Sequence, residues 1–264
     1  MQDLTITLVQ ADLSWENKQS NFITFEKVLS SLEDITDVII LPEMFSTGFI
    51  TEPKNLAENM EGETMNWMKQ QAKMFNVVIA GSLVVIENGK YFNRFVWMKP
   101  DGTYEYYDKR HLFHPGNEHL QFSQGETRKI VEIKGWKVCL QVCYDLRFPV
   151  WSKNRYADGK YEYDLLVYIA NWPAVRSYPY RQLLIAHAIE NQCYVAAVNR
   201  VGTDGKGTNH QGESTVIDFK GKHITELEAN TESHQTITLR YEDLKTFRDS
   251  FTVGMDWDKF EISL

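Results

Sequence analysis

The segment KVCLQVCYDLRFPVW, residues 137–151, decides both the fold class and the chemistry expected of this 264-residue chain. Its first part, residues 137–142, is a largely apolar run of the kind that forms a buried β-strand. Cys143 closes this run, and the polar turn of residues 144–147 follows at once. A nucleophile at a sharp strand-to-helix turn is exposed, and the backbone N–H groups after it can bind a developing oxyanion. We therefore predict that Cys143 is a nucleophile, with its thiol pKa lowered by the helix N-terminus.

The other two cysteines lack this setting. Cys139 lies in the middle of the same predicted strand, and Cys193 lies between a predicted helix and a predicted strand. We expect both to be buried and inert, which is the common state of a free cysteine. Three cysteines, an odd number in a long chain, also do not indicate a disulfide framework. The cytoplasm is therefore the expected location.

Strand-like and helix-like stretches alternate on both sides of the opening segment. Apolar or alternating runs predict strands, and apolar side chains three and four residues apart predict amphipathic helices. The expected strands are residues 4–10, 37–42, 77–86, 91–99, 104–107, 129–134, 136–142, 164–170, 194–199, 213–219, 222–227 and 234–239. The expected helices are residues 15–33, 63–75, the region near 149–156, and 180–192, and residues 109–128 read as a long loop. Because no Gly/Pro/Ser-rich linker or short repeat interrupts the chain, we expect one α/β domain over residues 1–264.

The charge and hydropathy of the chain exclude two classes of partner. The formal net charge is −8 and no Lys/Arg cluster stands out, which argues against a nucleic-acid groove or an anionic membrane surface. The longest apolar run, residues 77–86, is interrupted by Gly81 and Ser82 and is too short to span a bilayer. A small anionic substrate is compatible with this charge, because one buried cation can bind a carboxylate.

The C-terminal tail, residues 241–264, scatters large apolar side chains among charges. So many apolar groups do not favour a tail that is free in water. The sequence predicts that the tail packs on its own domain or across an oligomer contact, and it does not separate the two.

Three further residues are candidates for chemistry with Cys143. Glu43 ends the apolar run of residues 39–42, where a carboxylate points into the crevice at the ends of parallel strands and desolvation raises its pKa. Lys109 follows a predicted strand and supplies a positive charge that suits an anionic intermediate. Glu118 lies nine residues later in the same loop, where its carboxylate is able to orient Lys109.

Other patterns in the chain do not predict a site. The spacing of His111, His114 and His119 is not a zinc signature, and no Cys or Asp completes it, so we expect no metal. The stretch GTDGKG, residues 202–207, lacks the GK[ST] of a phosphate loop and reads as a surface turn. No GxSxG is present, so a serine hydrolase lacks its main marker.

Seven segments of the chain resemble one known family. LPEMFSTGF (41–49), YDKRHLF (107–113) and VCYDLRFPVW (142–151) resemble the nitrilase superfamily of carbon–nitrogen hydrolases, in that chain order. Four more segments resemble its YafV-type ω-amidase branch: NRF (93–95), YIANWP (168–173), AIENQCYVAAVNRVG (188–202) and GES (212–214). The resemblance runs from the first predicted strand to the tail.

The resemblance implies a fold, an assembly and roles for four residues. The fold is a four-layer αββα sandwich, and two copies pair as a homodimer. Glu43 is then the general base, Lys109 the oxyanion partner, Cys143 the nucleophile and Glu118 the second glutamate. The stretch at residues 155–162 is longer than the family pattern suggests and is expected to enlarge a surface loop. No cofactor is expected.

The expected activity is hydrolysis of the terminal amide of a short dicarboxylic acid monoamide, such as α-ketoglutaramate or succinamate, through a cysteine thioester. Arg147, four residues after the nucleophile, is expected to bind the distal carboxylate. The backbone N–H of Tyr144 is expected to bind the oxyanion. Asn171 and Trp172, which follow a buried strand, are expected to wall the pocket, and Phe113 to close it.

Two alternatives stay open at this point. A nitrilase or an N-carbamoyl amidohydrolase would use the same triad with a different pocket. A non-catalytic interaction protein could keep the scaffold, although the presence of all four chemical groups argues against it.

Overall fold

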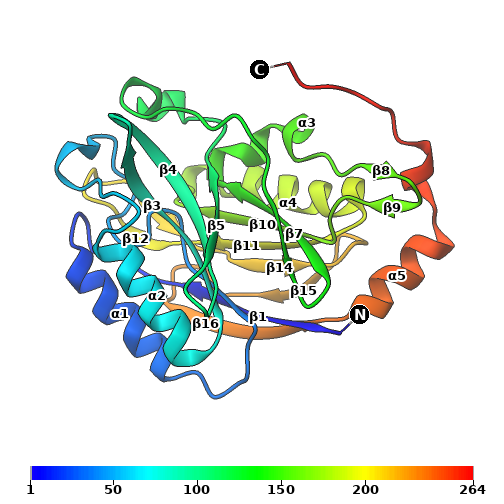
Figure 1. Ribbon diagram of the computed structural model, residues 1–264, viewed down its shortest axis with the longest axis horizontal. Helices are drawn as coiled ribbons and strands as arrows, with labels where there is room; N and C mark the ends of the chain where they lie inside the picture. Colours follow the sequence, from blue (N-terminus) through cyan, green and yellow to red (C-terminus); the bar gives the residue numbers. More distant parts are fainter. Residues whose placement is uncertain (1, 264) are drawn as a thin grey trace.

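Apolar runs along the chain form two six-stranded β-sheets in the computed structural model, which describes residues 2–263 (Figure 1). The first sheet has the order β16-β1-β2-β3-β4-β5, with β1, β2 and β3 parallel and the outer pairs antiparallel. Strands covered on both faces read as continuous apolar runs, and all three residues of β2 are buried. The bounds are β1 (Leu4–Gln10), β2 (Val38–Ile40), β3 (Val78–Glu87), β4 (Lys90–Met98), β5 (Tyr104–Asp108) and β16 (Ser233–Leu239).

The second sheet repeats this plan in the second half of the chain. Its order is β15-β14-β11-β10-β7-β6, and the central strands β7, β10 and β11 are parallel. The bounds are β6 (Ile130–Ile133), β7 (Trp136–Val142), β10 (Leu165–Ala170), β11 (Tyr194–Asn199), β14 (Thr215–Ile217) and β15 (His223–Glu226). Two hairpins lie outside the large sheets: β8 (Tyr156–Ala157) with β9 (Lys160–Tyr161), and β12 (Val201–Thr203) with β13 (Asn209–Gln211).

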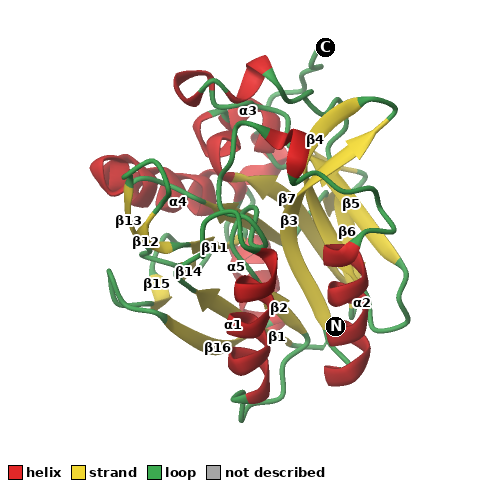
Figure 2. Cartoon of the chain, turned by 90° about the vertical axis from the view of Figure 1, so that its left-hand side faces the viewer, coloured by secondary structure: helices red, strands yellow, loops and turns green. Residues whose placement is uncertain are grey.

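Helices cover the outer face of each sheet. The first sheet is covered by α1 (Lys18–Ser30) and α2 (Glu63–Phe75), which lie side by side in Figure 1. The second sheet is covered by α4 (Ser177–Asn191), with the short α3 (Pro149–Ser152) beside it, and Figure 2 shows α4 on the other side of the molecule from α1 and α2. The inner faces of the two sheets share one apolar core. The four-layer αββα sandwich expected from the sequence is confirmed.

The region after α3 differs from the expectation. The helix expected near residues 149–156 ends at Ser152, because the Asn154 side chain donates to the carbonyl oxygens of Tyr163 and Asn191 at 2.9 and 3.1 Å. Such side-chain bonds to the backbone compete with helix continuation. Residues 155–162 then form the small hairpin β8–β9 where a loop was expected.

The tail begins with α5 (Tyr241–Ser250). Leu244 is buried, and the guanidinium of Arg248 donates to Asp164 Oδ1 at 2.6 Å. The chain then continues past Tyr161, whose ring meets the edge of Trp257. No helix among residues 2–263 is both long and apolar enough to cross a membrane.

Candidate active site

Four polar side chains follow strand ends at one edge of the two sheets. Glu43 comes after β2, Lys109 after β5, Cys143 after β7 and Asn171 after β10. Ligands of α/β proteins bind at the carboxyl ends of parallel strands, and here the facing sheets bring two such edges together. The fold therefore gathers residues that are far apart along the chain.

Cys143 stands on a strained turn. Its φ of 44° lies in the left-handed region, which is uncommon for a residue other than glycine and costs conformational energy. The short 3-10 helix η4 (Cys143–Arg147) starts here, so the N–H of Tyr144 belongs to a first turn that has no partner within the helix. Asp145 holds the turn, because its Oδ2 accepts the Val142 N–H at 3.0 Å and its Oδ1 accepts the His111 N–H at 3.0 Å.

Lys109 lies between two carboxylates. Its Nζ is 2.9 Å from Glu43 Oε1 and 2.9 Å from Glu118 Oε2, and all three side chains are completely buried. The Phe113 N–H also donates to Glu118 Oε2, at 2.6 Å. Glu43 Oε1 and Glu118 Oε2 both face the Lys109 ammonium inside this buried cluster. The position of Nζ is therefore well defined.

The charges of this cluster shift the pKa values of its members. Burial alone would lower the pKa of Lys109, but the charges of Glu118 and Glu43 outweigh burial and raise it. Burial raises the pKa of Glu118, against the effect of the Lys109 ammonium. Lys109 therefore stays protonated and supplies a permanent positive charge beside Cys143.

The surroundings of Cys143 favour the protonated form of its thiol. Burial raises its pKa well above the ordinary value, and the charge of the Glu43 carboxylate raises it further. Lys109 and the Asn171 backbone lower it, but by less. The expectation of a thiol pKa lowered by a helix N-terminus is therefore wrong, because η4 is a single short turn and burial and Glu43 outweigh it.

Two asparagines orient Glu43. Asn93 Nδ2 donates to Glu43 Oε1 at 2.8 Å and to Glu118 Oε1 at 3.2 Å, so it joins the two carboxylates. The Asn171 N–H donates to Glu43 Oε2 at 2.8 Å, and Asn171 Nδ2 donates to the Glu43 carbonyl at 2.5 Å. Asn93 is not among the expected site residues. A polar residue inside the apolar run of residues 91–99 was the signal available in the sequence.

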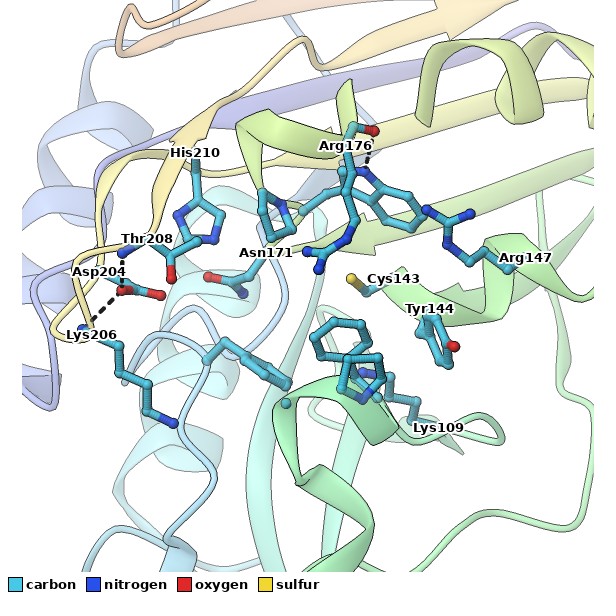
Figure 3. A pocket seen from close by; sticks show the side chains of 16 residues that line it. Lys109, Cys143, Tyr144, Arg147, Asn171, Arg176, Asp204, Lys206, Thr208 and His210 are labelled. Atoms are coloured by element: carbon cyan, nitrogen blue, oxygen red, sulfur yellow. Dashed lines mark hydrogen bonds between the residues drawn. The ribbon is translucent and has the colours of Figure 1, made fainter. Parts of the chain in front are cut away.

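A cavity of about 240 Å³ opens above this cluster (Figure 3). Lys109 and Cys143 form part of its wall, and Glu43 and Glu118 lie buried behind it. All five expected substrate-binding residues line the cavity: Phe113, Tyr144, Arg147, Asn171 and Trp172. Within this wall the Arg147 guanidinium lies over the Trp172 ring at 4.9 Å, and the Phe113 ring meets the edge of Tyr144 at 5.1 Å.

Five further polar side chains in the wall were not expected from the sequence. Arg176 comes from the 3-10 helix η5 (Ala174–Arg176), and the β12–β13 hairpin supplies Asp204, Lys206, Thr208 and His210. The GTDGKG stretch, expected to be only a surface turn, thus also borders the cavity. Asp204 Oδ1 holds this turn by accepting the backbone N–H groups of Lys206 and Thr208, at 2.9 and 2.8 Å.

The histidines of the 109–128 loop have structural partners. His111 Nδ1 pairs with Asp145 Oδ1 at 2.7 Å, and its ring stacks on Phe148. The rings of His114 and His119 stack on each other, with centroids 3.8 Å apart. Among residues 2–263, no group of three or more His, Cys, Asp or Glu side chains is arranged to hold a metal ion.

Comparison with known proteins assigns the family. A family model described as carbon-nitrogen hydrolase matches residues 5–249. The chain belongs to the carbon–nitrogen hydrolase family. The resemblance to the nitrilase superfamily is therefore confirmed, and so is the expectation that the protein is an enzyme of this class.

Known proteins are similar to this carbon–nitrogen hydrolase over most or all of its length. The "Omega-amidase YafV" of Escherichia coli (strain K12) is 43% identical over 266 residues, which cover 99% of this chain and 100% of the relative. The "2-oxoglutaramate amidase" of Bacillus subtilis (strain 168) is 33% identical, and the match covers 84% of this chain and 85% of the relative. A crystal structure of a CN-hydrolase superfamily protein from Xanthomonas campestris, with an arsenic adduct in its active site, has a TM-score of 0.97 and 43% identity, with 100% of both chains covered.

Proposed function

We propose that this carbon–nitrogen hydrolase is an ω-amidase, which hydrolyses the terminal amide of a short dicarboxylic acid monoamide such as α-ketoglutaramate or succinamate. The observation that carries the proposal is the shared cavity of Cys143 and Arg147, with Glu43 and Lys109 at the thiol. The names of the Escherichia coli and Bacillus subtilis relatives support the same substrate class.

The first half of the reaction forms a thioester and releases ammonia. Glu43 takes the proton of the Cys143 thiol, and the sulfur forms a bond to the amide carbonyl carbon. The Lys109 ammonium and the Tyr144 N–H stabilise the oxyanion. The C–N bond then breaks as Glu43 returns its proton to the nitrogen, which leaves as ammonia.

The second half regenerates the thiol. Glu43 takes a proton from a water molecule, and the water oxygen attacks the thioester carbon. The new oxyanion occupies the same donors, and the C–S bond breaks as Cys143 recovers a proton. Glu118 keeps Lys109 in position through both halves, with Lys109 Nζ 2.9 Å from its Oε2. The products are a dicarboxylic acid and ammonia.

Arg147 selects the substrate by binding its distal carboxylate. A guanidinium forms two parallel charge-assisted hydrogen bonds with a carboxylate, and Trp172 supports the guanidinium from behind. Asn171 and Trp172 form walls of the pocket, and Phe113 narrows it.

Ammonia release from a panel of substrates tests the proposal. We expect turnover of succinamate and α-ketoglutaramate, and little or none of a nitrile or an N-carbamoyl amino acid. Cys143→Ala should abolish turnover of every substrate, and Arg147→Gln should raise KM for succinamate more than for the neutral butyramide. Preference for a nitrile or a carbamoyl compound would point to the rival hydrolases, and normal activity of Cys143→Ala would refute the thioester.

We also propose that the enzyme is a cytoplasmic homodimer. The outer side of the second sheet supports a dimer contact, because Val150 on α3 and Ile189 on α4 are 58% and 52% exposed. The unpaired state of all three cysteines, one of them the nucleophile, supports a reducing compartment. Light scattering should give a dimer mass that Val150→Asp with Ile189→Asp lowers to a monomer mass. Cell fractionation tests the location.

A further inference from the structure

A second guanidinium reaches the cavity that holds Cys143. Arg176 is the last residue of η5 and is partly buried in the cavity wall. Figure 3 shows its side chain extending toward Cys143, while Arg147 enters from a different wall. The two arginines lie 29 positions apart along the chain, on separate elements of the fold.

One tryptophan holds both arginines. Trp172 Nε1 donates to the Arg176 carbonyl oxygen at 2.7 Å, and the Trp172 ring supports the guanidinium of Arg147 at 4.9 Å. The indole is only 3% exposed, so it is fixed by its surroundings. The indole therefore fixes the backbone of Arg176 and supports the guanidinium of Arg147 in the same cavity wall.

Neither guanidinium has a carboxylate partner among residues 2–263. The Arg176 guanidinium lies over an aromatic face, 5.4 Å from the Phe113 ring centroid. The deeply buried arginines elsewhere are each paired with an aspartate: Arg94 with Asp108, Arg200 with Asp12 and Arg248 with Asp164. Two guanidiniums without a carboxylate partner in one cavity favour the binding of an anion from outside.

We propose that Arg176 is a specificity-determining residue, which binds the distal carboxylate of the substrate together with Arg147. The inference rests on the proposed ω-amidase function and adds a residue to it. Charge-assisted hydrogen bonds from two guanidiniums favour a carboxylate, and a neutral amide leaves both cations without a partner. Arg147 and Arg176 together then select against neutral amides.

A purely structural role for Arg176 makes a different prediction. If the guanidinium only covers Phe113, its removal loosens a wall that touches Glu118 through the Phe113 N–H. Such loosening would impair all amides alike, because it would act on the catalytic cluster. The two roles therefore differ in their dependence on the charge of the substrate.

The experiment compares succinamate with butyramide, which replaces the carboxylate by a methyl group. Arg176→Gln should lower kcat/KM for succinamate about 10- to 100-fold, mainly through KM, with butyramide changed by about twofold or less. Arg155→Gln is the matched control, because Arg155 is exposed, lies outside the cavity and covers Phe260 at 5.5 Å, much as Arg176 covers Phe113. It should leave both substrates unchanged.

A binding assay gives a readout that does not depend on turnover. Succinate should protect Cys143 from iodoacetamide in the wild-type enzyme, and Arg176→Gln should require about 10-fold more succinate for the same protection. Equal losses on both amides, or unchanged protection by succinate, would overturn the role of Arg176. Equal rates of wild-type enzyme on succinamate and butyramide would instead refute the proposed substrate class.

Discussion

Glu43 and Lys109 meet with Oε1 and Nζ 2.9 Å apart, although 66 positions separate them in the chain and both side chains are completely buried. Lys109 also pairs with Glu118, so one ammonium lies between two carboxylates in a buried cluster. Removing one member of such a cluster leaves a buried charge without a partner.

Lys109→Met should therefore abolish turnover and lower the free energy of unfolding by about 3–5 kcal/mol at pH 7. The loss should be smaller at pH 5.5 than at pH 7, because burial raises the pKa of Glu118 and the variant removes the Lys109 charge that lowers it. Urea unfolding at both pH values measures the effect. Lys54→Met, at an exposed position, is the control, and equal stability of the two variants would contradict the prediction.

Glu43→Gln should lower the pKa of the Cys143 thiol while it abolishes turnover. The charge of the Glu43 carboxylate raises this pKa, and the amide removes the charge. Titration of thiolate absorbance, in a background with Cys139→Ala and Cys193→Ala, measures the pKa. An unchanged or higher pKa would show that burial alone sets it.

Asp145→Asn should reduce kcat about 10- to 100-fold through displacement of the nucleophile. The carboxylate accepts N–H groups from Val142 and His111 and the Tyr107 hydroxyl at 2.8 Å, and an amide nitrogen cannot accept them. Steady-state kinetics should show the loss in kcat more than in KM. Asp101→Asn, in an exposed turn, should behave as wild type.

Acid should destabilise the fold through His187. Burial lowers the pKa of this imidazole to about 4, from an ordinary value of 6.5. Between these pH values the unfolded chain binds a proton that the folded chain does not, so stability is complete above pH 6.5 and falls as the pH drops toward 4, by roughly 3 kcal/mol in total.

Urea unfolding from pH 7 to pH 4.5 measures this dependence. His187→Gln should make the curve flatter in that window, whereas His234→Gln, at an exposed position, should not. Burial also lowers the pKa of His210 to about 4. This second histidine should therefore preserve part of the decrease in stability with falling pH.

Arg248→Met should loosen the tail. The guanidinium donates to Asp164 Oδ1 and to the carbonyl oxygens of Gln192 and Tyr163, and its loss leaves a buried carboxylate without its cation. We expect residues 241–263 to be cut faster by a protease and the enzyme to be less stable by about 3–5 kcal/mol. Lys245→Met, on the exposed side of α5, should leave both measurements unchanged.

Local patterns predicted most of the large elements of the fold. Apolar runs predicted the central strands, and apolar side chains three and four residues apart predicted α1, α2 and α4. Both patterns arise because a strand or helix must bury its apolar face. The same patterns failed after α3, where the Asn154 side chain ends the helix through contacts with Tyr163 and Asn191. Tyr163 and Asn191 lie in other parts of the chain. The end of this helix therefore cannot be predicted from the local sequence pattern.

The sequence by itself predicted which groups carry the chemistry, because Glu43, Lys109 and Cys143 each follow a predicted strand in a segment that resembles the family. Only the tertiary structure decided the direction of the thiol pKa shift, which depends on burial and on the approach of Glu43 across the two sheets. It also decided the contacts of Asn93 with Glu43 and Glu118 and the position of Arg176 in the cavity wall. Electrostatics and cavity shape depend on distances through space, and spacing along a chain does not contain them.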